Sequence, residues 1–301
     1  MLPSELLRFG EPRFSYTPLK RRKPFSWPRG SGLAVYFALN LEHYSPEGGL
    51  TENLVEGGGT PDILNVSWRE YGNRIGAWRL LEAFRASGLP ATILLNSDVC
   101  RYFPDLVAEC AAQGHELSAH GRSNSESQRC MDEASEQEMI AEATHVIREA
   151  GGVAPRGWLS PWLAETATTP DLLHEAGYKY LLDWCVDDQP FWMKTRRGRI
   201  LSLPYSVEIN DSVAIIGRNV GAAEFGDMII DHVDEMAEQA RSAPLALGIA
   251  LHGYIVGQPY RLMHIRRALA HLATLARDKV WVATAGEIAD HFGLNQPCED
   301  D

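Results

Sequence analysis

The chain has 301 residues, of which 45% are hydrophobic, and a formal net charge of −12 at pH 7. This length and apolar content are enough for a substantial core, in one large α/β domain or two smaller ones. The acidic balance argues against nucleic acid or an anionic membrane as a partner, because both would repel the chain at long range.

The first residues and the cysteines indicate a reducing compartment. Residues 1–8 lack the basic-then-apolar order of a signal peptide, and no apolar stretch approaches the length of a membrane span. The five cysteines are dispersed without a C-x-x-C pair. Such a set is typical of reduced thiols and predicts neither a disulfide framework nor a structural zinc site. We therefore expect a cytoplasmic protein.

The first 32 residues are rich in Pro, Arg and Lys and predict an extended N-terminal arm. Because the chain as a whole is acidic, we expect the basic cluster at residues 21–23 to pack on the protein itself or on a neighbour. Residues 33–294 are expected to form one catalytic domain, and residues 295–301 a loose acidic tail.

The stretch from Leu33 to Glu42 is a continuous apolar run that ends in two polar residues, Asn40 and Glu42. Such a run predicts a strand buried on both faces, as in a parallel sheet or barrel. Polar residues at the carboxyl end of such a strand lie where α/β folds keep their active sites. The Gly-rich stretch 45–60 that follows predicts a functional loop, which we do not assign as a lid from its composition.

Strands and helices then alternate along the chain. Helical spacing covers 74–87, 103–113, 135–150, 169–176, 224–242, 260–277 and 286–292, with a capping box at Ser135 and Glu138. Strands are predicted at 91–96, 116–120, 156–161, 178–184, 200–204, 212–216, 245–251 and 280–283. This alternation predicts a distorted, incomplete (β/α) barrel of about seven parallel strands in a single domain.

Three of the predicted strands end in a titratable residue, namely Glu42, His120 and His252. In a barrel these ends converge on one face. A carboxylate with two histidines suits hydrolysis of an amide or ester, because one group activates water, or holds a metal that does, while another protonates the departing nitrogen. A single histidine at a strand end is more often a packing residue, but three such ends in separate units favour a catalytic role.

Further candidates lie at other strand ends and are expected to bind substrate. Arg156 suits a substrate carbonyl and equally an aspartate that it orients, and Trp162 suits a wall of the site as well as the core. For Asp188, substrate binding is weighed against a surface or helix-capping role. Asn210 and Asp211 suit substrate amide groups, although Asn-Asp is also turn chemistry.

The stretch 114–121, GHELSAHG, resembles the second motif of the polysaccharide deacetylase superfamily. Asn40-Leu-Glu42 stands where that superfamily keeps its paired aspartates, residues 156–162 look like its third motif, and Leu251-His252 looks like its last. The resemblance runs from about residue 9 to residue 292, and the motif order agrees. It implies the superfamily's distorted barrel and a divalent metal such as zinc, for which Glu42 and His120 would be ligands.

Two departures separate this chain from the metal-dependent members. Asn40 occupies the position of the usual base, and Asn124 replaces the second ligand histidine. A neutral amide is a poor ligand for a transition metal. In these losses the chain is similar to the allantoinase-type and cyclic-imide-hydrolase-type branch, whose members open cyclic amides, can work without a metal and form homo-oligomers. Asn124 and Tyr254 are the positions expected to set the substrate.

The sequence thus predicts a hydrolase of non-peptide carbon–nitrogen bonds that opens a small cyclic amide, imide or ureide and requires no cofactor. Two alternatives stay open: a metal-dependent deacetylase of an N-acetylated sugar, and an inactive barrel with a binding role. The expected partners are a small-molecule substrate and further copies of the chain. The catalytic residues are expected to be Glu42, His120 and His252, and the substrate-binding residues Asn40, Asn124, Arg156, Trp162, Asp188, Asn210 and Asp211.

Overall fold

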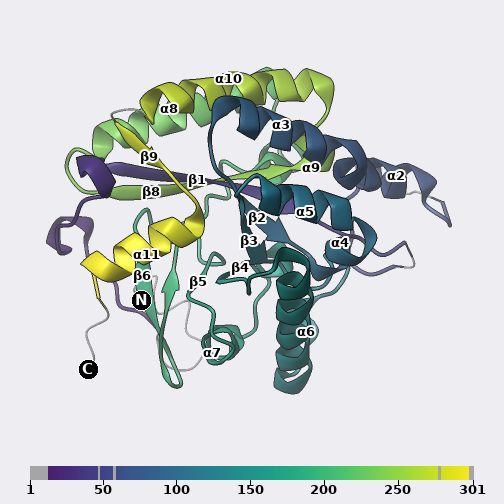
Figure 1. The fold of residues 1–301 in the computed structure, drawn as a ribbon, viewed down its shortest axis with the longest axis horizontal. Coiled ribbons are helices and arrows are strands. Elements are labelled where there is room, and N and C mark those ends of the chain that lie inside the picture. The colour runs from purple at the N-terminus through teal and green to yellow at the C-terminus, as the bar shows by residue number, and fades with distance from the viewer. Residues whose placement is uncertain (1–12, 47, 57–58, 277–278, 298–301) are drawn as a thin grey trace.

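The computed structural model describes residues 13–46, 48–56, 59–276 and 279–297, and in that part of the chain nine strands form one sheet (Figure 1). The strand order is β6-β7-β5-β4-β3-β2-β1-β8, with β9 also paired to β1. All pairings are parallel except that of β6 with β7. The strands are β1 (Leu33–Leu41), β2 (Thr92–Leu95), β3 (Glu116–Ala119), β4 (Gly157–Trp158), β5 (Tyr180–Leu181), β6 (Phe191–Thr195), β7 (Gly198–Ser202), β8 (Leu245–His252) and β9 (Val280–Val282).

Strand β1 pairs with three neighbours, β2, β8 and β9, and all nine of its residues are buried. β8 runs along one edge of β1, and the register ends with Asn40 beside His252. On the other edge, β9 pairs with the first residues of β1 and β2 with the last. The segment after β7 reaches back to β8, where the backbone N–H of Ala250 donates to the carbonyl of Ile209 at 3.0 Å. The sheet therefore curls toward closure, which confirms the predicted distorted, incomplete barrel.

Helices cover the outside of this curled sheet (Figure 1). Several begin at a side chain that accepts a backbone N–H: Asp62 before α2, Asp132 before α6 and Thr284 before α11. None of the helices in the described ranges has the length and apolar character that a membrane span needs. They are α2 (Ile63–Tyr71), α3 (Ala77–Ser87), α4 (Ser97–Tyr102), α5 (Pro104–Ala112), α6 (Glu133–Gly151), α7 (Thr169–Glu175), α8 (Ala222–Gln239), α9 (Gly253–Val256), α10 (Pro259–Leu275) and α11 (Ala285–Asn295).

The inside of the curled sheet is filled by side chains. Tyr36 and Tyr180 are fully buried there, and each phenol has a partner: Tyr36 donates to the carbonyl of Pro204 at 2.7 Å, and Tyr180 donates to Glu116 at 2.9 Å. Buried polar tips are expected to be paired in this way, because an unpaired one is costly. The interior of the curled sheet is thus a packed core.

The described part of the N-terminal arm packs on the rest of the chain. Arg22 forms an ion pair with Asp187 at 2.6 Å, and the buried indole of Trp27 donates to the carbonyl of Leu245 at 2.7 Å. Within the basic cluster at residues 21–23, Arg22 thus pairs with an acidic residue of the chain itself. Of the expected acidic tail, residues 298–301 lie outside the described residues.

The structure departs from the predicted local structure in several places, which include helices α2 and α4, both absent from the prediction. Residues 212–216 belong to a π-helical turn, Ser212–Gly217, because an apolar run this short does not distinguish a strand from a helix. Strand β6 was not predicted; it is an edge strand of five residues in which only Met193 is buried. The cap of α6 is Asp132, whose carboxylate accepts from the backbone N–H of Ser135 at 2.8 Å, so Ser135 lies inside the helix.

Four glycines let α9 approach the π-helical turn η3 (Gly72–Gly76) closely, and α9 carries Tyr254. A Cβ on Gly76 would lie 1.9 Å from the carbonyl oxygen of Gly253, a backbone atom that cannot yield. We expect Gly76→Ala to destabilise the protein by about 2 kcal/mol or more. Chemical unfolding measures this cost, with Gly221→Ala as the control, because a Cβ there meets nothing within 4 Å. Equal unfolding midpoints for the two variants would contradict the prediction.

Candidate active site

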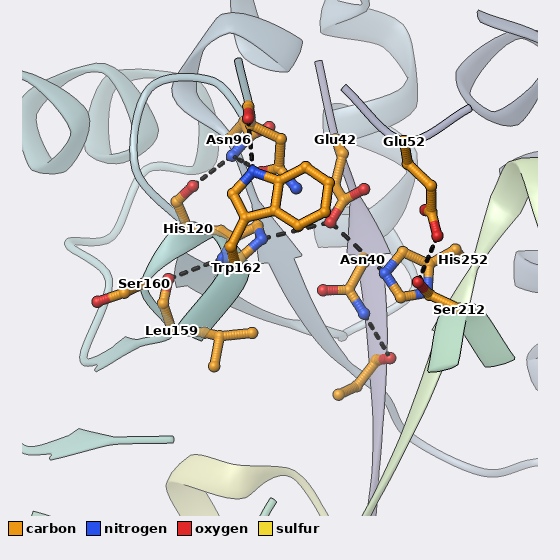
Figure 2. Close-up of polar contacts among 12 residues, drawn as sticks. Asn40, Glu42, Glu52, Asn96, His120, Leu159, Ser160, Trp162, Ser212 and His252 are labelled. Carbon is orange, nitrogen blue, oxygen red and sulfur yellow. Dashed lines mark hydrogen bonds and ion pairs between the residues drawn. The ribbon is translucent and has the colours of Figure 1, made fainter. Parts of the chain in front are cut away.

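Three side chains from separate strands meet at the carboxyl end of the sheet (Figure 2). Glu42 directly follows β1, His120 directly follows β3, and His252 is the last residue of β8. The Nε2 atoms of His120 and His252 lie 3.4 Å and 3.5 Å from Oε1 of Glu42. All three residues are buried. The structure thus brings together the three residues that were expected to carry the chemistry.

The ring of His120 is oriented by a backbone carbonyl. Its Nδ1 lies 2.7 Å from the carbonyl oxygen of Leu159, the residue that follows β4. A carbonyl only accepts hydrogen bonds, so Nδ1 carries the hydrogen. Nε2 is thereby directed at the carboxylate of Glu42.

His252 is backed by a second buried carboxylate, Asp211. Asp211 Oδ1 lies 2.5 Å from His252 Nδ1, and its Oδ2 accepts the backbone N–H of the same histidine at 2.8 Å. Burial lowers the pKa of His252, but Asp211 and Glu42 outweigh burial and hold this pKa well above its usual range. His252 is therefore an imidazolium whose Nε2 hydrogen faces Glu42, which is the form a general acid needs.

The carboxylate of Glu42 is held by four side chains. In addition to the two histidines, its Oε2 accepts from the hydroxyls of Tyr44 at 2.7 Å and Tyr254 at 2.9 Å. Burial raises the pKa of Glu42, but the charge of His252 and the hydrogen bonds of both histidines hold it well below its usual range. Glu42 is therefore an ionised carboxylate in a buried site, as a general base requires.

A second carboxylate, Glu52, lies next to this group and was not predicted. Its Oε1 accepts from the hydroxyl of Ser212 and its Oε2 contacts the hydroxyl of Tyr254, both at 2.5 Å. The segment that carries it is fastened by Arg69, which donates to the carbonyl of Glu52 at 2.7 Å, and by Asn65, which accepts the N–H of Leu54. Burial raises the pKa of Glu52. The Gly-rich composition of 45–60 indicated a functional loop but did not single out this residue.

Asn124 and Trp162 border the site, and Figure 2 shows Trp162 beside Glu42 and His120. The amide oxygen of Asn124 accepts from Asn96 at 3.1 Å, and its backbone carbonyl accepts the indole N–H of Trp162 at 2.7 Å. Trp162 has a left-handed φ of 62°, which a bulky residue rarely adopts. Its ring centre lies 6.4 Å from that of Tyr44, whose hydroxyl donates a hydrogen bond to Glu42. The two rings thus form an aromatic wall beside the carboxylate.

Asn40, Asn210 and Asp211 are all buried near His252. The amide of Asn40 donates to the carbonyl of Leu251 at 3.3 Å. Asn210 accepts the backbone N–H of Ser212 at 2.9 Å, which is the turn role that had been weighed against substrate binding. The expectation that Asp211 binds substrate is not supported, since both of its oxygens are used by His252.

The structure does not bring Arg156 or Asp188 to this group. Arg156 precedes β4 and forms an ion pair with Asp290 of α11, at the amino ends of the strands. The carbonyl of Asp188 accepts the N–H of Ala246, at the start of β8 and so far from its last residue, His252. Arg156 precedes a strand of only two residues, and Asp188 lies in the loop after β5, which returns to the start of β8; the sequence shows neither arrangement.

The side chains do not match a complete metal site. Among the residues that the structure describes, no group of three or more His, Cys, Asp or Glu side chains could hold a metal ion. Zinc sites use three or four such ligands. Asn124 stands where the metal-dependent members have their second ligand histidine, and its amide oxygen accepts a hydrogen bond from Asn96. We therefore derive no step through a metal.

Comparison with known proteins gives consistent results. The family model "Polysaccharide deacetylase" matches residues 70–181. The crystal structure of a probable polysaccharide deacetylase from Pseudomonas aeruginosa PAO1 is 29% identical, with a TM-score of 0.80, and the match covers 94% of this chain and 96% of that one. The crystal structure of PuuE allantoinase is 27% identical, with a TM-score of 0.77, covering 95% and 96%. The peptidoglycan deacetylase of Helicobacter pylori is 27% identical over 59% of this chain and 56% of its own length.

These similarities confirm the predicted resemblance to the polysaccharide deacetylase superfamily and to its allantoinase-type branch. They also indicate that the chain is a hydrolase of carbon–nitrogen bonds that is similar to the polysaccharide deacetylases. The relatives act on different compounds by their names, so the substrate has to be argued from the site.

Proposed function

We propose that this hydrolase opens a small cyclic amide, imide or ureide without a metal. The observation that supports this most is geometric: the buried carboxylate of Glu42 lies 3.5 Å from Nε2 of His252, whose Nδ1 lies 2.5 Å from the buried carboxylate of Asp211. A base and an acid in one buried site are what water attack on an amide and departure of its nitrogen require. The likeness of the whole chain to PuuE allantoinase supports the ring-opening type of substrate.

In the proposed reaction, Glu42 takes a proton from water, and the water oxygen attacks the ring carbonyl carbon. His120 fixes the carboxylate for this step through its Nε2, 3.4 Å away. The carbon–nitrogen bond then breaks, and Nε2 of His252 gives its hydrogen to the departing nitrogen. The hydroxyls of Tyr44 and Tyr254 hold the other oxygen of Glu42 and keep the base oriented.

A metal-dependent deacetylase of an N-acetylated sugar is the second candidate, supported by the family match and by the Helicobacter pylori relative. The donor set counts against it, since the described residues offer no group of three metal-binding side chains. The two candidates also differ in the shape of their substrates. Buried catalytic groups beside aromatic rings favour a small planar ring, whereas a polymer needs an open groove.

Hydrolysis of a panel of rings (allantoin, hydantoin, dihydropyrimidines and succinimide), alongside N-acetylglucosamine oligomers, tests this proposal. Each is measured before and after treatment with a chelator. We expect turnover of at least one ring, unchanged by chelation. Turnover that is lost on chelation and restored by one metal would overturn the metal-free mechanism. Deacetylation without ring opening would favour the second candidate, and inertness toward every compound would favour a binding role.

A further inference from the structure

The hydroxyl of Tyr254 lies between two carboxylates. Its oxygen is 2.9 Å from Oε2 of Glu42 and 2.5 Å from Oε2 of Glu52. The hydroxyl of Tyr44 is 3.2 Å away and contacts the same oxygen of Glu42 at 2.7 Å. Glu42 and Glu52 are thus joined through one phenol, which the reaction proposed above does not use beyond orienting the base.

The number of hydrogens in this chain of contacts is informative. A phenol has one hydrogen, so Tyr254 cannot donate to both carboxylates. If Glu52 were ionised as well, two oxygens without a hydrogen between them would face each other at hydrogen-bond distance, which is unfavourable in a buried place. A hydrogen on Glu52 removes this conflict: Glu52 donates to Tyr254, and Tyr254 donates to Glu42.

The surroundings show which carboxyl group carries that hydrogen. Glu42 contacts two imidazole nitrogens. The carboxyl group of Glu52 contacts only two hydroxyl groups, those of Ser212 and Tyr254. The titratable groups that face Glu52 are Tyr254, Tyr44, His252, Glu42 and Arg69, of which Arg69 bonds its backbone carbonyl instead of its carboxyl group. Glu42 is therefore the ionised member of the pair and Glu52 the neutral one.

We propose that Glu52 is a neutral carboxyl group and that Glu52 and Tyr254 form the path by which a proton leaves the active site. This inference rests on the proposed ring-opening reaction for its role, and on the contacts alone for the protonation of Glu52. Glu42 is buried, whereas Glu52 lies at intermediate exposure in the 45–60 segment. The three groups thus lead from the buried base toward solvent.

The chemistry requires such an exit for an imide or ureide. Water adds across the carbon–nitrogen bond: a carbon–oxygen bond forms, the carbon–nitrogen bond breaks, and the nitrogen keeps the hydrogen from His252. The released nitrogen belongs to an amide or urea and does not bind a further proton. The new carboxylic acid ionises at neutral pH. One of the two protons of water recharges His252, so one proton per turnover must leave.

The path carries that proton in a balanced sequence. Glu52 first releases its hydrogen to solvent, Tyr254 then gives its hydrogen to the ionised Glu52, and protonated Glu42 gives its hydrogen to the oxygen of Tyr254. Afterwards Glu42 is ionised, and Tyr254 and Glu52 each carry one hydrogen, as before. No oxidant, reductant or further reactant takes part.

The kinetic test uses Glu52→Gln, which keeps the shape of the side chain but cannot exchange a proton. On a ring that the wild type opens, we expect kcat to fall about tenfold or more, with little change in KM, and to recover as the concentration of a small buffer such as imidazole rises. Wild-type turnover should not depend on the buffer. Glu56→Gln, an exposed residue of the same segment, is the matched control and should behave as the wild type. A loss of kcat that no buffer restores would overturn the exit role.

The spectroscopic test needs no substrate. Burial also raises the pKa of Glu165, Asp183 and Glu116, so the infrared difference between variants is measured. The difference spectrum of wild type minus Glu52→Gln at neutral pH should contain the C=O stretch of a protonated carboxyl group, and that of wild type minus Glu56→Gln should not. A difference spectrum for Glu52→Gln without such a band would overturn the neutral state of Glu52. If the wild type opens no ring, the proposed function fails, while this measurement still decides the protonation of Glu52.

Discussion

Replacing Glu42 by Gln is expected to lower kcat on the ring substrate by roughly 10²- to 10⁴-fold, the usual contribution of a general base. The amide has the size of the carboxylate and can still accept from Tyr44 and Tyr254, so the loss reports chemistry and not packing. The negative charge that faces His120 and His252 disappears at the same time. Steady-state kinetics with saturating substrate measure the effect.

A control variant and a second measurement make this test specific. Glu138→Gln, on the exposed face of α6, is the matched control and should leave kcat unchanged. Glu42 is one of the two carboxylates that raise the pKa of His252, so Glu42→Gln should also lower the pKa of that histidine, measured by NMR titration. Full turnover in a folded Glu42→Gln variant would contradict the assignment of Glu42 as the base.

The three central residues could be predicted because each follows from local sequence. The run from Leu33 to Leu41 is apolar throughout, so its polar end had to lie at the mouth of the sheet, and His120 and His252 end strands of the same kind. The alternation of strands and helices is also a local pattern, so the architecture could be predicted from it. In a parallel sheet the carboxyl ends of the strands then converge on one face.

The partners of these residues could not be predicted, because they come from distant parts of the chain. Tyr254 is 202 residues from Glu52 and 212 from Glu42, and no spacing rule joins them. Asp211 was expected to bind substrate, since nothing in the sequence shows that it faces His252, 41 residues later. Arg156 was misplaced because β4 has only two residues, too few to show which of its ends faces the site.

Replacing Asp211 by Asn is expected to shift the pH dependence of turnover. Asp211 is the largest influence that raises the pKa of His252. A general acid works in its protonated form, so activity is present below this pKa and is lost as the pH rises through it. In Asp211→Asn that pKa falls, and the alkaline limb of the kcat profile should therefore move to lower pH. At neutral pH we expect a loss of roughly 10²-fold or more.

A comparison of pH profiles separates this effect from a loss of folding. The control is Asp290→Asn, the same chemical change at the ion pair with Arg156 at the other end of the sheet, which should leave the profile in place. If Asp211 only fastened the backbone of His252 through its second oxygen, the variant would lose activity equally at every pH. A shift of the alkaline limb requires the charge of Asp211 to act on the imidazole, because a neutral Asn retains a hydrogen bond and cannot retain the charge.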